Sequence, residues 1–212
     1  SSRRRHTRCA DVTGVQTCAL PIFHLGFNKK VEKSSVKYTR LAPDINIPKL
    51  HWKRDKPDSR DYSYTWGAPA IASTVDLRQY CSPIEDQGNL GSCTGNAVAG
   101  AIELLNKRNK KPTDVSRLFI YYYERLLEGT VGYDSGAYIR DGIRATNKYG
   151  APLENLWPYQ INRFRTAPSA TANTDGLKRK VTLYERAGDF NAVINALSNG
   201  FPVIIGFDVY SS

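Results

Sequence analysis

The stretch that decides the fold is a glycine-rich segment leading into a helix, Asp86-Gln87-Gly88-Asn89-Leu90-Gly91-Ser92-Cys93-Thr94. Its glycines favour a loop in which the backbone can approach a ligand closely. After Cys93, apolar residues recur at spacings of three and four, which predicts an amphipathic helix whose buried face has mostly small side chains. The segment therefore places a thiol in the first turn of a helix.

This position suits a nucleophilic thiol, because the thiolate is the reactive form and a helix amino terminus lowers the pKa of a thiol. Gln87 lies six residues before Cys93, near enough for the loop to fold its amide beside the sulfur. That amide and the Cys93 backbone N–H would then donate to the oxyanion of a tetrahedral intermediate. The alternative is that Cys93 is a small buried helix residue, and spacing alone leaves both open. For Cys81, which has neither a glycine loop nor a helix start, we predict inert packing.

Periodicity and punctuation predict further elements along the chain. A second helix is capped by Asp114, has its apolar face at Leu118, Phe119, Tyr122 and Leu126, and ends at Gly129. The other predictions are a helix over 137–148 stopped by Gly150, a loop over 169–176, a helix over 190–198 capped by Asp189, and strands at 181–184 and 201–209. Helices first and strands later indicate an α+β protein.

The amino-terminal quarter has a different character. Residues 23–75 are polar and punctuated by prolines, which predicts an extended lead-in segment pinned by aromatic side chains. Residues 1–22 combine a basic start with a mildly apolar stretch, the outline of a secretory signal, but polar residues interrupt its centre. Residues 12–22 are more similar to the in-frame translation of a sequencing-library adapter, so we expect residues 1–22 to be an artefact.

Composition excludes several classes of protein. The 212 residues are 41% hydrophobic with a net charge of +10, and no apolar run is long enough for a spanning helix. The basic run at 106–111 suits a solvated helix end, with a nucleic-acid patch as the alternative. Four irregularly spaced cysteines predict no disulfide framework, and three scattered histidines predict no zinc site.

Gln-Gly-x-x-Gly-Ser-Cys at the start of a helix, shortly after Val75-Asp76-Leu77-Arg78, resembles the active-site entry of the papain-like cysteine peptidases. The bacterial branch is the most similar, since its lead-in resembles residues 55–62. The likeness continues through ordered blocks at 116–122, 134–137, 156–159 and 200–203, and covers about residues 50–212.

This resemblance implies an α+β fold of the papain type, with an α-helical half over 76–165, an incomplete antiparallel β half over 166–212, and a cleft between them. It implies Cys93 as nucleophile, Gln87 as oxyanion-hole amide, and a peptide or protein substrate, with no metal, cofactor, nucleic-acid or membrane partner. It also implies Gly91, Ser92, Ser135 and Gly136 as substrate-binding positions. The alternative for 135–136 is a simple loop before the third helix.

Three departures qualify the resemblance. Thr94 stands where many relatives have tryptophan, and Leu90 where many have a disulfide cysteine. The family's general-base histidine and its asparagine are expected beyond residues 201–209, whereas all three histidines precede Cys93. We therefore expect the chain as printed to be a fragment that is inactive by itself.

Other function classes remain open on the sequence alone. The first is a peptide-binding relative without activity, because the residues that would decide this lie past Ser212. A thiol acyltransferase such as a transglutaminase or amidase uses the same nucleophile logic but lacks the ordered blocks after the cysteine. A basic nucleic-acid binder is the remaining alternative.

Overall fold

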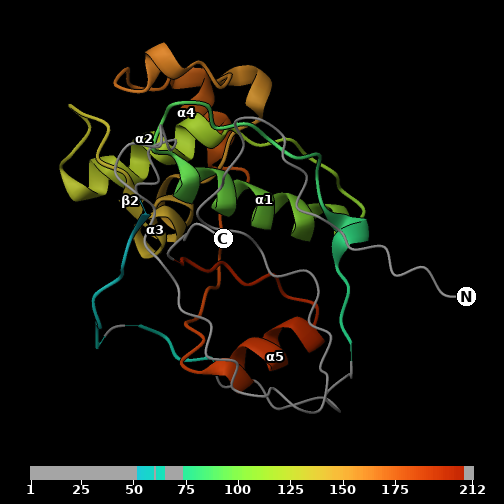
Figure 1. Cartoon of the computed structure of the whole chain (residues 1–212). Helices are drawn as coiled ribbons and strands as arrows, with labels where there is room; N and C mark the ends of the chain where they lie inside the picture. Colours follow the sequence, from blue (N-terminus) through green and yellow to red (C-terminus); the bar gives the residue numbers. More distant parts are fainter. Residues whose placement is uncertain (1–51, 60, 65–73, 208–212) are drawn as a thin grey trace, which may run out of the picture.

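A computed structural model describes residues 52–59, 61–64 and 74–207. Its helices are α1 (Cys93–Arg108), α2 (Arg117–Glu128), α3 (Ile139–Tyr149), α4 (Ala170–Gly176) and α5 (Phe190–Ser198). Short 3-10 turns lie at Arg78–Tyr80, Glu154–Leu156 and Ile161–Arg163. Figure 1 shows α1 to α4 grouped in one half, with α5 set apart beside the irregular carboxyl-terminal chain.

Helix α1 lies at the centre of this group because its side chains are small. Ala97, Ala99 and Ala101 are buried, and α2 and α3 both pack against the helix. Leu104 near its end joins Leu77 and Leu197, so the same helix also contacts α5. The predicted helix, its small-residue face and its start at Cys93 are confirmed.

Helix α2 begins later than predicted. Its cap is Ser116, whose hydroxyl accepts a hydrogen bond from the Phe119 N–H at 3.2 Å and donates to the Trp157 carbonyl at 2.5 Å. The prediction of Asp114 as the cap is therefore wrong, because Ser116 lies at the spacing from which a side chain reaches the third helical N–H. Gly129 ends the helix in the left-handed conformation, as predicted. Leu126, expected to face inward, is 42% exposed.

The two predicted strands, at 181–184 and 201–209, are not formed in the described residues. Residues 181–184 are irregular, and within 201–207 only Ile204 has a β-bridge; residues 208 and 209 lie outside the described part. The one sheet among the described residues is a parallel pair, β1 (Trp52–Lys53) with β2 (Ala137–Tyr138). A strand needs a hydrogen-bonded neighbour, and β-rich composition alone does not provide one.

The lead-in segment is attached by both backbone and charge. Trp52 is in register with Ala137 across the β1–β2 pair. Asp61 accepts hydrogen bonds from Arg140 at 2.7 Å and from Arg186 at 2.8 Å. Of the aromatic side chains expected to pin this segment, Tyr62 is 68% exposed with its ring 6.4 Å from that of Tyr184, and Tyr64 accepts a hydrogen bond from Asn199 at 2.9 Å. Trp66, also expected to do so, lies outside the described residues.

The basic run after α1 has a structural use. Arg108 donates to the Gly200 carbonyl at 2.6 Å, and Lys107 donates to the Cys81 carbonyl at 2.9 Å. Lys110 and Lys111 are exposed. Two cations of the run therefore hold the end of α1 to neighbouring segments, a role that goes beyond the solvated end that we predicted.

The predicted loop at 169–176 is helix α4. Ser169 caps it by accepting the Ala172 N–H at 3.2 Å. Asp175, near its end, is buried and accepts hydrogen bonds from Arg179 at 2.7 Å and from the Leu153 N–H at 3.1 Å. These bonds, led by that from Arg179, lower the pKa of Asp175 to about 2.

We predict that Asp175→Asn lowers the free energy of unfolding at pH 7 by roughly 2 kcal/mol. A depressed carboxyl pKa stabilises the fold above the unfolded pKa of about 3.9, and that contribution is lost as the pH falls toward the folded pKa. Urea unfolding of both proteins between pH 7 and pH 3 should show the gap closing at the acidic end. Asp76→Asn, in the exposed pair with Arg78, is the control and should cost less than about 1 kcal/mol. A gap independent of pH would contradict the assignment.

Candidate active site

Cys93 is the first residue of α1, and its side chain is fully buried. Ser92 precedes it as the helix cap, and the Ser92 carbonyl accepts the Asn96 N–H at 3.0 Å to begin the helical ladder. The Ser92 hydroxyl makes no bond to the helix N–H groups; it pairs with the Tyr159 hydroxyl at 2.5 Å. The thiol therefore sits at the positive end of a helix dipole, the position that favours a thiolate.

Gln87 folds back into the same loop. Its side-chain amide donates to the Leu90 carbonyl at 3.0 Å, and the whole residue is buried. The turn is made by Gly88, which has φ +56° and donates its N–H to the Asp86 carboxylate at 2.7 Å. An amide nitrogen carries two hydrogens, so Gln87 retains one N–H that a substrate oxyanion could accept.

Asp134 connects the nucleophile loop to the segment that precedes β2. Both of its oxygens lie within hydrogen-bond distance of the Gly91 N–H, at 3.1 and 3.0 Å. One of them also accepts from the Tyr121 hydroxyl. Gly91 and the Ser135–Gly136 segment, which the sequence predicted at a common site, are thus held together through a residue between them.

The backbone of Gly136 is already engaged. Its N–H donates to the Tyr121 hydroxyl at 3.2 Å, and its carbonyl accepts from the Ser135 hydroxyl at 2.7 Å. Gly136 has φ +63°, a conformation that favours glycine. A carbonyl has a second lone pair, so the oxygen of Gly136 is still able to accept from an extended peptide.

A buried carboxyl lies beneath the nucleophile helix. Thr94, next to Cys93, donates to Glu124 of α2 at 2.5 Å, and both side chains are fully buried. Burial raises the pKa of Glu124 well above its ordinary value. A Cβ on Gly142 would lie 2.6 Å from the second Glu124 oxygen, so α3 makes room for this carboxyl by having a glycine there.

Sequence reasoning missed the residues that hold the site, namely Asn96, Arg117, Glu124, Asp134 and Tyr159. Arg117, Asp134 and Tyr159 fall inside the blocks that carried the family resemblance, which was the only signal available. Most of their contacts join residues 21 to 72 positions apart, a range at which periodicity carries no information.

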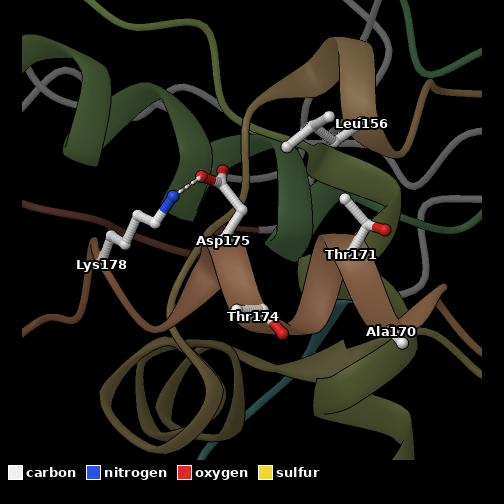
Figure 2. Close-up of a pocket in the computed structure, with 6 residues that line it drawn as sticks. All are labelled: Leu156, Ala170, Thr171, Thr174, Asp175 and Lys178. Carbon is white, nitrogen blue, oxygen red and sulfur yellow. Dashed lines mark ion pairs between the residues drawn. The ribbon is translucent and has the colours of Figure 1, made fainter.

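A hollow on the surface lies away from Cys93, and its one acidic side chain is already engaged in ion pairs. Figure 2 shows it between α4 and the 3-10 turn at 154–156, lined by Leu156, Ala170, Thr171, Thr174, Asp175 and Lys178. Its acidic group, Asp175, is already bonded to Arg179, Lys178 and Leu153. Neither Cys93 nor Gln87 lines this hollow.

In the part of the chain that the structure describes, every helix falls short of the length and apolar character that a bilayer crossing demands. The same residues contain no group of three or more His, Cys, Asp or Glu side chains placed to hold a metal ion.

Cys93 thus opens a buried helix, and the glycine loop that leads into this helix holds the buried side-chain amide of Gln87. No protein-family model matches the chain. An uncharacterized peptidase C1-like protein of Acanthamoeba polyphaga mimivirus is 36% identical over 191 residues, covering 75% of this chain and 61% of that protein. Cathepsin K of Gallus gallus is 27% identical over 192 residues, covering 88% and 54%.

Solved structures agree. Xylellain, a cysteine protease from Xylella fastidiosa, matches with a TM-score of 0.64 at 36% identity, over 71% of this chain and 63% of that one. Procathepsin L 3 of the Tenebrio molitor larval midgut matches with a TM-score of 0.52 at 20% identity, over 65% and 45%, and supports the fold alone. These relatives support a papain-like cysteine peptidase family for the chain, and the predicted fold class is confirmed. It spans 61% and 54% of the two curated relatives.

We predict that iodoacetamide alkylates Cys93 at least about tenfold faster than Cys81 at pH 7, because a helix amino terminus favours the thiolate. Exposure alone predicts the reverse order, since Cys93 is fully buried and Cys81 is half-buried. Burial also raises the pKa of Cys81. Peptide mapping by mass spectrometry after timed labelling reports each site separately, and Cys93→Ala identifies its peptide. Faster labelling of Cys81 would mean that access decides reactivity and the helix terminus does not.

Proposed function

We propose that Cys93 is the nucleophile of a peptidase that hydrolyses peptide bonds through a thioester acyl-enzyme. One observation carries this proposal: Cys93 is the first residue of α1, and Gln87 in the loop leading into this helix is buried, with its side-chain amide bonded to the Leu90 carbonyl. The 36% identity to a cysteine protease of known structure supports the same assignment.

In the proposed reaction the Cys93 thiolate attacks the carbonyl carbon of the scissile bond, and a C–S bond forms. The carbonyl oxygen becomes an oxyanion that accepts hydrogen bonds from the Gln87 amide and the Cys93 backbone N–H. The C–N bond breaks as the leaving amine takes up the proton that the thiol gave to a general base. Water then hydrolyses the thioester, which releases the acid and restores the thiol.

The general base is proposed to be a histidine outside this sequence, as the family resemblance implies, oriented by an asparagine. No histidine occurs in the described ranges 52–59, 61–64 and 74–207. A thiolate–imidazolium pair requires that partner, so the printed chain alone is proposed to be inactive.

The substrate is proposed to be a peptide or protein chain lying in extended form along Gly91, Ser92, Ser135 and Gly136. The second lone pair of the Gly136 carbonyl supports one hydrogen bond to such a chain. A substrate that pairs with the Gly136 N–H replaces its bond to Tyr121, which at 3.2 Å is a long one.

One observation favours a second function, that of a peptide-binding relative without activity: the Cys93 side chain is fully buried. Turnover by the full-length protein decides between the two, because a binding protein would retain peptides uncleaved.

We predict that Gln87→Ala in the full-length protein lowers kcat by 10²- to 10³-fold with little change in KM, because the lost donor acts on the transition state. Cys93→Ala should abolish turnover. Asn89→Ala, an exposed position in the same loop, is the matched control and should leave kcat within about twofold. Hydrolysis of a fluorogenic peptide measures all three. Equal losses in Asn89→Ala and Gln87→Ala would point to loop disruption in place of oxyanion binding.

We also predict no turnover above the uncatalysed rate for the printed 212-residue chain, and activity for the full-length protein with the same peptide. Circular dichroism of the shorter chain checks that its helices are formed. Clear hydrolysis by the shorter chain that Cys93→Ala abolishes would show that the base lies within the printed sequence.

A further inference from the structure

A chain of polar contacts runs from α2 through α1 to the nucleophile loop. Arg117 donates to the Asn96 side-chain oxygen at 3.0 Å, and the Asn96 amide nitrogen donates to the Ser92 hydroxyl at 3.1 Å. The Ser92 hydroxyl pairs with the Tyr159 hydroxyl at 2.5 Å, and Tyr159 donates to the backbone carbonyl of Gln87 at 2.9 Å. The chain ends on the residue whose side chain is the proposed oxyanion donor.

The chemistry of its two ends fixes the direction of every bond. A guanidinium has no acceptor, so the Asn96 oxygen must face Arg117 and its NH₂ must face Ser92. A backbone carbonyl cannot donate, so the Tyr159 hydroxyl must give its proton to Gln87. Ser92 is therefore the donor to Tyr159. All four bonds point from the cation toward the Gln87 carbonyl, an arrangement in which each bond polarises the next.

Tyr159 is itself held firmly. The Arg117 guanidinium lies 4.1 Å from the centre of the Tyr159 ring, and the backbone N–H of Tyr159 donates to the Glu154 carboxylate at 2.5 Å. Burial raises the pKa of the Tyr159 hydroxyl, so it stays a donor at the pH values at which a thiol hydrolase works. Arg117 also donates to the Asp86 carbonyl at 3.1 Å. Two consecutive carbonyls of the loop, 86 and 87, are thus fixed by one assembly.

We propose that Tyr159 is a positioning residue whose hydroxyl joins the backbone carbonyl of Gln87 to the side-chain hydroxyl of Ser92 and so holds the two ends of the nucleophile loop. It thereby holds the Gln87 amide in place as an oxyanion donor. The second statement rests on the proposed peptidase function, whereas the first concerns the loop alone. Tyr159 itself touches no reacting atom in this assignment.

Tyr159→Phe tests the proposal, because it removes the hydroxyl and keeps the ring on Arg117. Hydrogen–deuterium exchange of residues 87–92 in the full-length protein should become about tenfold faster, with α3 unchanged. A peptide aldehyde, whose adduct with Cys93 places an oxygen in the oxyanion position, should bind about tenfold more weakly. Alkylation by iodoacetamide, which forms no oxyanion, should change less than twofold. The kcat should fall about tenfold with KM unchanged.

Two further variants sharpen the result. Tyr133→Phe alters a tyrosine that is 60% exposed and should leave all four quantities unchanged. Ser92→Ala interrupts the chain at its middle, so the double variant with Tyr159→Phe should be no worse than the more impaired single variant.

Unchanged exchange of residues 87–92 in Tyr159→Phe would overturn the proposal whatever the enzyme does. Equal losses of aldehyde binding and alkylation would also overturn it, since that pattern means general damage to the site. If the unmodified protein neither cleaves peptides nor binds the aldehyde, the peptidase function fails. Faster exchange in the variant would still support the positioning of the loop.

Discussion

The buried amino terminus of α1 is the constraint on which the rest of the structure depends. The first N–H groups of a helix have no partner within it, and burial removes the water that would otherwise bind them. The loop and the side chains around a thiol placed there must therefore have hydrogen-bond partners for their own polar groups. Asp134 meets the Gly91 N–H just before the helix, and Thr94 in its first turn is bonded to Glu124. Small side chains along α1 allow these partners to approach.

Helix α2 holds both the nucleophile loop and the segment at 134–136 through residues on one of its faces. Its residues Arg117, Tyr121 and Arg125 are spaced by four and lie on one face. Arg117 binds the nucleophile loop, and Tyr121 binds Asp134 and Gly136. Arg125 is fully buried and donates to the carbonyls of Val131 and Tyr133, with its guanidinium 4.1 Å from the Tyr121 ring. A buried cation is tolerated there because carbonyl oxygens surround it.

The periodicity of apolar residues was sufficient to predict most of the helices, but it could not predict the contacts between them. It located α1, α2, α3 and α5 because each buries an apolar face at helical spacing. It failed for α4, whose polar residues 170–176 show no such face and whose helix is fixed by the Ser169 cap and the bonds of Asp175. The 117–121–125 face was also missed, because arginine and tyrosine are ordinarily assigned to the surface. Only the ordered blocks shared with the papain-like family brought these residues near the thiol.

The loop before Cys93 is held without a disulfide among the described residues. Leu90 is the position at which the family resemblance leads us to expect a disulfide cysteine, and its side chain is buried in the same core cluster as Leu118 and Trp157. The loop is therefore held by apolar burial on one side and by the Asp134 carboxylate and the Tyr159 hydroxyl on the others. Hydrogen bonds and packing do not respond to a reducing environment as a disulfide does. The geometry of the loop before Cys93 consequently rests on the packing of Leu90, the bonds of the Asp134 carboxylate and the bond from the Tyr159 hydroxyl.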